Sequence, residues 1–177
     1  LWNYTVEGSV VYSAAISADG EYITAGLNDG KVYLFNKDSS TPLWNYTVEG
    51  SVYSVPISAD GEYIAVSSWD DGKLYLFGKD SSTPLWSYDA GDEVQSVVIS
   101  ADGEYIAAGS GYYDSNVWIG NVSLFDKDSS TPLWSYTTGY PVVSLAISAD
   151  GEYITAGSGA YWNGWRNVSL FNKDSST

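Results

Sequence analysis

Short apolar runs alternate with polar, turn-forming clusters along the whole chain, and the pattern recurs with a period of about 40 residues. In the first unit, such runs occupy residues 1–6, 10–17, 21–26 and 31–36. The runs are rich in Val, Ile, Tyr, Phe and Trp and end at Gly or Pro clusters, which predicts strands rather than helices. The pattern therefore predicts four short strands in each unit.

Some predicted strands are apolar on both faces, as in Val32-Tyr33-Leu34-Phe35. A strand of this kind is expected in a sheet that is covered on both sides. We therefore expect the four-stranded units to pack face to face.

Two phrases mark the repeat. Ile-Ser-Ala-Asp-Gly-Glu-Tyr-Ile occurs at 16–23, 57–64, 99–106 and 147–154. Lys-Asp-Ser-Ser-Thr begins at Lys37, Lys79, Lys127 and Lys173. The units are residues 1–42, 43–84, 85–132 and 133–177, with no linker or change of composition between them. We therefore predict one domain over residues 1–177.

The carboxylates of the first phrase are best explained by turn formation. Asp-Gly supplies the positive φ that a tight hairpin needs, and Asp side chains hydrogen-bond their own backbone. The spacing lacks the alternating carboxylates of a calcium loop, so no metal site is predicted at the four turn residues Asp19, Asp60, Asp102 and Asp150. The Glu that opens the third strand recurs in every unit, which indicates a structural role.

Four antiparallel strands per unit of about 40 residues are typical of β-propeller blades. The segment Ile-Ser-Ala-Asp-Gly-Glu-Tyr-Ile-Thr-Ala-Gly at residues 16–26 resembles the Ser-Pro-Asp-Gly segment of WD40 repeats, and Leu34-Phe35-Asn36 stands where that family has Trp-Asp. Val32-Tyr33-Leu34-Phe35 followed by Leu43-Trp44 is similar to pyrroloquinoline-quinone-type propeller repeats. The resemblance implies an all-β propeller of four-stranded antiparallel blades, four per chain. The Trp-Asp and Gly-His pairs are absent, so neither the WD40 His-Asp network nor a quinone cofactor is expected.

The resemblance also sets the phase of the repeat. In WD40-type propellers, the first strand of a unit is the outermost strand of the preceding blade. Leu1–Val6 is then an outer strand without its own blade, and the last blade lacks one. We expect Leu1–Val6 to pair with Val168–Phe171 of the same or another chain. Because four such blades make a tight ring, the expected assembly is a C2 pair with eight blades, or a chain cut from a longer propeller.

Composition excludes several functions. The chain has no Cys and no His, so disulfides, thiolate metal sites and histidine general bases are ruled out. Its 22 acidic and 7 basic residues give a formal charge of −15, which disfavours nucleic acid and anionic lipid as partners. No apolar run approaches the ~20 residues of a membrane span.

The units differ most after the third strand. Units three and four insert residues 110–120 and 158–166, and the connection into the innermost strand varies as well. In a propeller these segments share one face, and aromatic side chains there would suit a protein or glycan partner. The predicted binding residues are Tyr112, Tyr113, Trp118, Tyr161, Trp162, Trp165 and Arg166. The alternative is that these loops only cover the channel mouth. The adjacent acids Asp70-Asp71 and Asp92-Glu93 are interpreted as solvated loop residues.

Four sequons, at Asn3, Asn45, Asn121 and Asn167, predict glycosylation and an extracellular or cell-surface location. Four unmodified asparagines are the alternative.

The leading functional hypothesis is a non-catalytic scaffold that binds a protein or glycan partner at a cell surface. One alternative is a structural surface or filament protein whose copies join through blade edges. A quinoprotein-like enzyme is the third hypothesis, and the absence of His and of a nucleophile constellation argues against it.

Overall fold

The computed structural model describes residues 1–114, 117–159 and 166–175, and every regular element in this part of the chain is a β-strand. The strands form four antiparallel sheets, in the orders β1-β2-β3-β4, β5-β6-β7-β8, β9-β10-β11-β12 and β13-β14-β15. The strands are β1 (Val11–Ile16), β2 (Tyr22–Leu27), β3 (Lys31–Asn36), β4 (Trp44–Thr47), β5 (Val52–Ser54), β6 (Tyr63–Ser68), β7 (Lys73–Gly78), β8 (Trp86–Asp89), β9 (Val94–Ile99), β10 (Tyr105–Asp114), β11 (Val117–Asp126), β12 (Trp134–Thr137), β13 (Val142–Ile147), β14 (Tyr153–Gly159) and β15 (Arg166–Asn172).

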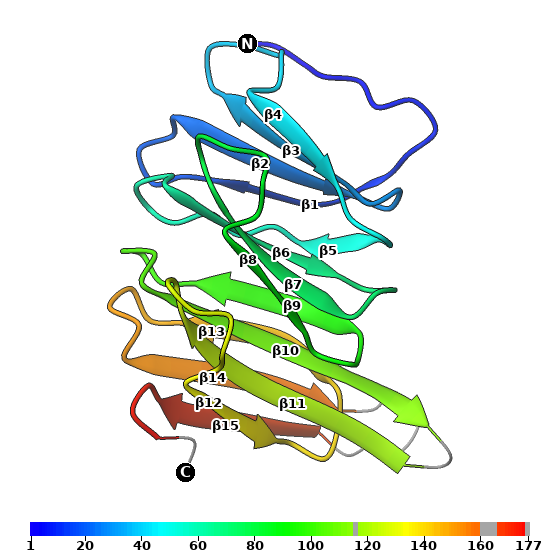
Figure 1. Ribbon diagram of the computed structural model, residues 1–177, viewed down its shortest axis with the longest axis vertical. Coiled ribbons are helices and arrows are strands. Elements are labelled where there is room, and N and C mark those ends of the chain that lie inside the picture. The colour runs from blue at the N-terminus through cyan, green and yellow to red at the C-terminus, as the bar shows by residue number, and fades with distance from the viewer. Residues whose placement is uncertain (115–116, 160–165, 176–177) are drawn as a thin grey trace.

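The sheets follow one another along the longest axis, and the two chain ends lie at opposite ends of the molecule (Figure 1). The first strands of neighbouring sheets, β1, β5, β9 and β13, contact one another in succession. In the first three sheets the outermost strand comes from the next sequence unit: β4, for example, begins unit two but pairs with β3. These features confirm the predicted propeller blades and the predicted phase of the repeat.

Each Ala-Asp-Gly turn is held by one serine, which is buried in the first three turns. Ser100 Oγ donates to Asp102 Oδ1 at 2.6 Å and accepts the backbone N–H of Tyr105 at 3.0 Å. Gly103, with φ +74, supplies the left-handed residue of the turn. The same bonds recur in the other three turns, which confirms that these carboxylates build hairpins.

The core lies between consecutive sheets. Val32 and Leu34 of β3 are fully buried against Ile64 and Phe77 of the second sheet. Trp44 of β4 closes this boundary: its ring stacks on Phe77 at 5.4 Å, and its Nε1 donates to the Lys79 carbonyl at 2.8 Å. The next two boundaries repeat the arrangement around Phe125 and Phe171.

Leu1–Val6 differs from the prediction because it is not a strand. In the described residues it joins no sheet, although it packs on the first sheet through Trp2 and Tyr4. It also does not pair with Val168–Phe171 of its own chain, since β15 pairs with β14 and the termini lie at opposite ends (Figure 1). Of the two alternatives left open, pairing within the same chain is therefore wrong, and pairing with another chain stays a prediction.

The insertion in unit three is not an irregular loop. β10 and β11 extend as one hairpin whose ladder continues through Tyr112↔Ile119, Tyr113↔Trp118 and Asp114↔Val117. Aromatic and β-branched residues on both arms favour this continued pairing. The hairpin projects beyond the neighbouring strands (Figure 1).

Candidate functional site

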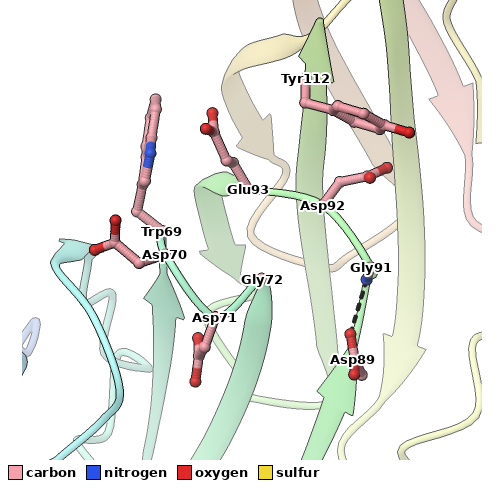
Figure 2. Close-up of a pocket in the computed structure, with 9 residues that line it drawn as sticks. All are labelled: Trp69, Asp70, Asp71, Gly72, Asp89, Gly91, Asp92, Glu93 and Tyr112. Atoms are coloured by element: carbon pink, nitrogen blue, oxygen red, sulfur yellow. Dashed lines mark hydrogen bonds between the residues drawn. The ribbon is translucent and has the colours of Figure 1, made fainter. Parts of the chain in front are cut away.

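An open pocket of about 530 Å³ lies where the second and third sheets meet, on the face with the variable loops. It is formed by the β6–β7 turn, the β8–β9 connection and the extended part of β10 (Figure 2). The two kinds of variable connection thus share one face, as predicted. The lining residues are Trp69, Asp70, Asp71, Gly72, Asp89, Gly91, Asp92, Glu93 and Tyr112.

Two aromatic side chains and five carboxylates give this pocket its chemistry. Trp69 and Glu93 extend in the same direction from their loops, and Asp92 points to the side where Tyr112 lies (Figure 2). The Asp89 carboxylate accepts the Gly91 N–H at 2.8 Å, which fixes the start of the β8–β9 connection.

Burial makes part of this negative charge unfavourable. Desolvation raises the pKa of Asp92. The pKa of Glu93 is also raised, first by desolvation and then by the nearby Asp70 charge, while a hydrogen bond from Trp69 acts in the opposite direction. A cation bound beside these two carboxylates would favour their ionised forms.

One lysine partly offsets the negative charge of the pocket. Lys73 Nζ lies 3.7 Å from Asp71 Oδ2, and Asp71 also accepts a hydrogen bond from the Tyr75 hydroxyl at 2.9 Å. Most other lysines are engaged elsewhere. The lysine of each Lys-Asp-Ser-Ser-Thr phrase pairs with the glutamate that precedes the second strand of its sheet, in the pairs Lys37–Glu21, Lys79–Glu62, Lys127–Glu104 and Lys173–Glu152. These pairs explain why that glutamate recurs in every unit.

Three aromatic side chains from the first two sheets contact one another in a row that ends at the pocket. Tyr12 of β1 and Tyr53 of β5 have ring centroids 5.1 Å apart, and Tyr53 lies 4.4 Å from Trp69. Both tyrosines are exposed. The rings are tilted by 57° and 31° to one another, and together they form an aromatic surface that is continuous with the acidic pocket.

The predicted binding residues are only partly brought together. Tyr112 lines the pocket, and Trp118 lies across the hairpin ladder, opposite the backbone of Tyr113. Arg166 is exposed at the start of β15, opposite Gly159. Tyr161, Trp162 and Trp165 lie outside the described residues.

The sequence interpretation missed the acidic half of the site. Asp70-Asp71 and Asp92-Glu93 were interpreted as solvated loop residues. Asp70 is indeed exposed and Asp92 and Glu93 are half-buried, whereas the Asp71 side chain is largely buried, and all four lie around one pocket. Trp69 was also missed, although it stands in a variable turn on the predicted face. The signal that was available is the pairing of an aromatic residue with acids in one loop of that face.

Asn45 lies on the outer strand β4 and Asn167 on the edge strand β15, whereas Asn121 lies on β11, which pairs on both sides, and Asn3 lies in the N-terminal segment. Asn3, Asn45 and Asn167 are exposed, whereas Asn121 is half-buried and accepts a hydrogen bond from Thr137 Oγ1 at 2.9 Å. Glycosylation therefore stays a prediction for all four.

Within residues 1–114, 117–159 and 166–175, no group of three or more acidic side chains is arranged to hold a metal ion. No helix of sufficient length and apolarity to cross a bilayer occurs in that same part of the chain.

Solved structures share this fold at low sequence identity. A Kuenenia stuttgartiensis hydrazine synthase chain aligns with a TM-score of 0.76 and 16% identity, over 95% of this chain and 49% of its own length. The β-propeller domain of Cps50 (Swd1) from Myceliophteria thermophila aligns with a TM-score of 0.70 and 12% identity, over 93% and 54%. The chain therefore spans about half the length of these structures, and the likeness shows the fold alone.

Sequence comparison gives the family. A search of curated proteins found no significant match. A family model described as "Outer membrane protein assembly factor BamB" matches residues 1–157 of the 177. With that match and four sheets that repeat the same propeller blade, the chain belongs to the family of outer membrane protein assembly factor BamB.

Proposed function

We propose that this chain is a non-catalytic protein-binding module of the cell envelope, and that it holds a basic segment of its partner on the variable-loop face. The observation that carries the proposal is the pocket between the second and third sheets. It combines aromatic walls, Trp69 and Tyr112, with carboxylates whose pKa is raised, Asp92 and Glu93.

A Lys or Arg side chain fits this chemistry. Its charge would be attracted by the five carboxylates and by the face of an indole or phenol ring, and charge-assisted hydrogen bonds to carboxylates are stronger than neutral ones. A cation near Asp92 and Glu93 would also favour their ionised forms. The net charge of −15 would speed the approach of a basic partner and would make binding sensitive to salt.

A protein is favoured over a glycan by the aromatic row. Tyr12, Tyr53 and Trp69 extend the pocket into a surface on which an extended segment would lie. The family description, an assembly factor for outer membrane proteins, agrees with a protein partner and with work at the envelope. Whether the chain reaches the outside of the cell is tested by its sequons: mass spectrometry of natively produced protein should find glycan on exposed Asn45, and bare asparagines at all four sites would oppose an exterior location.

The non-catalytic part of the proposal rests on chemistry. The chain has no His and no Cys to act as base or nucleophile, and the acids that recur in each unit are engaged in turns or lysine pairs. The acids of the pocket occur once, but they are grouped as a charge surface around two rings.

The proposal is tested by titrating a fluorescein-labelled hexalysine peptide at low salt and following its anisotropy. The variant Asp92→Asn/Glu93→Gln should weaken binding at least about tenfold, a loss of ~1.4 kcal/mol. Trp69→Ala should weaken it as well, because the ring that faces the cation is gone. Added salt should weaken binding to the original chain.

The matched control is Asp80→Asn/Asp128→Asn, which removes the same two charges from exposed positions beside Lys79 and Lys127. It should leave the affinity within about twofold if the pocket, rather than net charge, binds the peptide. Equal weakening by both double variants would refute a specific site. Binding of neutral oligosaccharides that disappears in Trp69→Ala would instead establish a glycan partner.

A further inference from the structure

Every boundary between neighbouring sheets has two complementary halves. The preceding sheet contributes two apolar side chains from its third strand, and the following sheet contributes the surface that receives them. At the first boundary these side chains are Val32 and Leu34, which pack against Ile64 and Phe77. At the next two boundaries the equivalent pairs are Leu74 with Leu76, and Val122 with Leu124. All six are fully buried.

The C-terminal sheet presents the first of these halves with nothing over it. Val168 and Leu170 of β15 hold the ladder positions of Val122 and Leu124, yet they are 87% and 66% exposed. Within the described residues, β15 also pairs on one side only, with β14. This end is therefore an apolar edge with both its ladder and its contact face open.

The N-terminal sheet presents the second half. Leu27, Tyr33 and Phe35 form a small buried cluster. The partly buried Val6, Ile23 and Ala25 and the exposed rings of Trp2 and Tyr4 pack against it. Beside them lies an apolar hollow of about 160 Å³. Its lining includes Trp2, Tyr4, Ala14, Ile23, Ala25 and Phe35.

Leu1–Val6 already makes half of the contacts of an outer strand. Trp2 Nε1 donates to the Lys37 carbonyl at 2.6 Å, and its ring lies 5.4 Å from Phe35. Trp44, in an identical six-residue sequence, makes the same two contacts one sheet further on. Residues around Trp44 additionally pair with β3, whereas Leu1–Val6 pairs with no strand in the described part of the chain.

The contacts between the turns of neighbouring sheets also lack a partner at each end of the chain. Gly103 lies so close to Tyr63 of the preceding sheet that a Cβ on it would stand 2.6 Å from the ring, and Gly61 and Gly151 make the equivalent contacts with Tyr22 and Tyr105. At Gly20 no described atom comes within 4 Å of such a Cβ, and Tyr153 is 53% exposed. Tyr153 and Gly20 are therefore the two halves of one further contact.

Backbone bonds between turns end in the same way. The N–H groups of Ala18, Ala59 and Ala101 donate to the carbonyls of Ala59, Ala101 and Ala149 at 2.9, 2.9 and 3.0 Å. The next bond in this series would run from the Ala149 N–H to the Ala18 carbonyl of another copy.

We propose that two copies of this chain join reciprocally, with Leu1–Val6 of each copy added to the edge of β15 in the other. The repeat fixes the register. Because Leu124 stands opposite Trp134, Ser123 opposite Ser135 and Val122 opposite Tyr136, the new ladder sets Leu170 against Trp2, Ser169 against Asn3 and Val168 against Tyr4. The pair contains eight sheets, and one copy covers 54% of a complete propeller domain.

Sedimentation equilibrium of the chain tests the association, and a discrete species of twice the chain mass is expected. Val168→Lys/Leu170→Lys should raise the dissociation constant at least about a hundredfold, because each of the two joints would bury unpaired charges. These residues are exposed in the single chain, so its circular dichroism should be unchanged. The control Leu85→Lys/Leu133→Lys, at exposed leucines away from the edge, should still pair. A monomer at about 100 µM would overturn the proposal.

The register is tested by cysteines, since the chain has none. Ser123 Oγ and Ser135 Oγ lie 2.8 Å apart, so Asn3→Cys/Ser169→Cys places thiols at the equivalent pair across the joint. Mild oxidation should give a covalent species of two chains. Asn3→Cys/Ser144→Cys, with the second thiol at the exposed position 144 of β13, should give no such covalent species. A cross-link within one chain, or a ladder of higher multiples, would overturn the reciprocal pair.

Discussion

Replacing Trp86 by Phe removes one hydrogen bond at the boundary between the second and third sheets while keeping an aromatic ring there. Trp86 Nε1 donates to the Lys127 carbonyl at 2.7 Å, and the indole lies 5.6 Å from Phe125. Both ends of the bond are partly buried. The carbonyl loses its donor, which costs about 1–3 kcal/mol, and the smaller ring loses part of its packing. We expect a total loss of about 2 kcal/mol in the free energy of unfolding.

Trp2→Phe is the matched comparison. Trp2 makes the same bond to the Lys37 carbonyl, at 2.6 Å, but its side chain is exposed. Water can replace the lost donor, so the expected cost is below about 1 kcal/mol. The comparison requires the single chain, because pairing of copies would cover Trp2.

The assay is urea unfolding at submicromolar protein, followed by circular dichroism. The slope of the transition should be unchanged in both variants, and only the midpoint should move. For a domain of this size, 2 kcal/mol corresponds to a fall in Tm of about 4–8 °C. If Trp86→Phe costs less than about 0.5 kcal/mol, or no more than Trp2→Phe, the hydrogen bond from Trp86 to the Lys127 carbonyl does not stabilise the sheet boundary, and the reasoning is wrong.

Three further predictions concern the turns and the pocket. Ser100→Ala removes the hydroxyl that holds Asp102 and the Tyr105 N–H, and should lower the free energy of unfolding by about 1–3 kcal/mol in urea titrations; an unchanged midpoint would contradict this role. Gly20→Ala and Gly103→Ala both place Ala at a positive φ, but only the second meets a neighbouring ring. In thermal unfolding, the free energy of unfolding should therefore fall by about 1 kcal/mol for Gly20→Ala and by about 1–3 kcal/mol more for Gly103→Ala. Burial raises the pKa of Asp92 and Glu93 above 3.8 and 4.5, so stability is lost as pH rises through the raised values. Asp92→Asn/Glu93→Gln should therefore gain up to about 1 kcal/mol at pH 7, since both groups are largely solvated, and the gain should vanish below the ordinary pKa values; a gain that persists there would refute the electrostatic explanation.

The fold was readable from the sequence because each unit repeats the same local signals. Ser100, Asp102 and Gly103 build their turn from contacts within six residues, so a repeated phrase predicts a repeated hairpin. Strand formation by the outer segment is different, because it depends on a partner. Residues 1–6 and 43–48 have identical sequences, but only the second contains a strand, since only it pairs with the edge of β3.

The candidate site was less predictable for a related reason. Asp70 and Glu93 belong to connections on either side of the strand pair β7–β8, and only the packing of the second sheet against the third brings them together. Adjacent acids in a loop are usually solvated, and the sequence carries no period that would mark them as neighbours. Tyr112 was identified because it lies in an insertion that interrupts the repeat, and such an insertion can be recognised from the sequence alone.

The offset between sequence units and sheets should set the order in which the sheets fold during synthesis. The first sheet takes β1, β2 and β3 from unit one and β4 from unit two, so it stays incomplete until residues 44–47 have left the ribosome. The second and third sheets wait in the same way for β8 and β12, which open units three and four. Folding should therefore advance stepwise along the nascent chain, with one apolar edge open at its leading end at every stage.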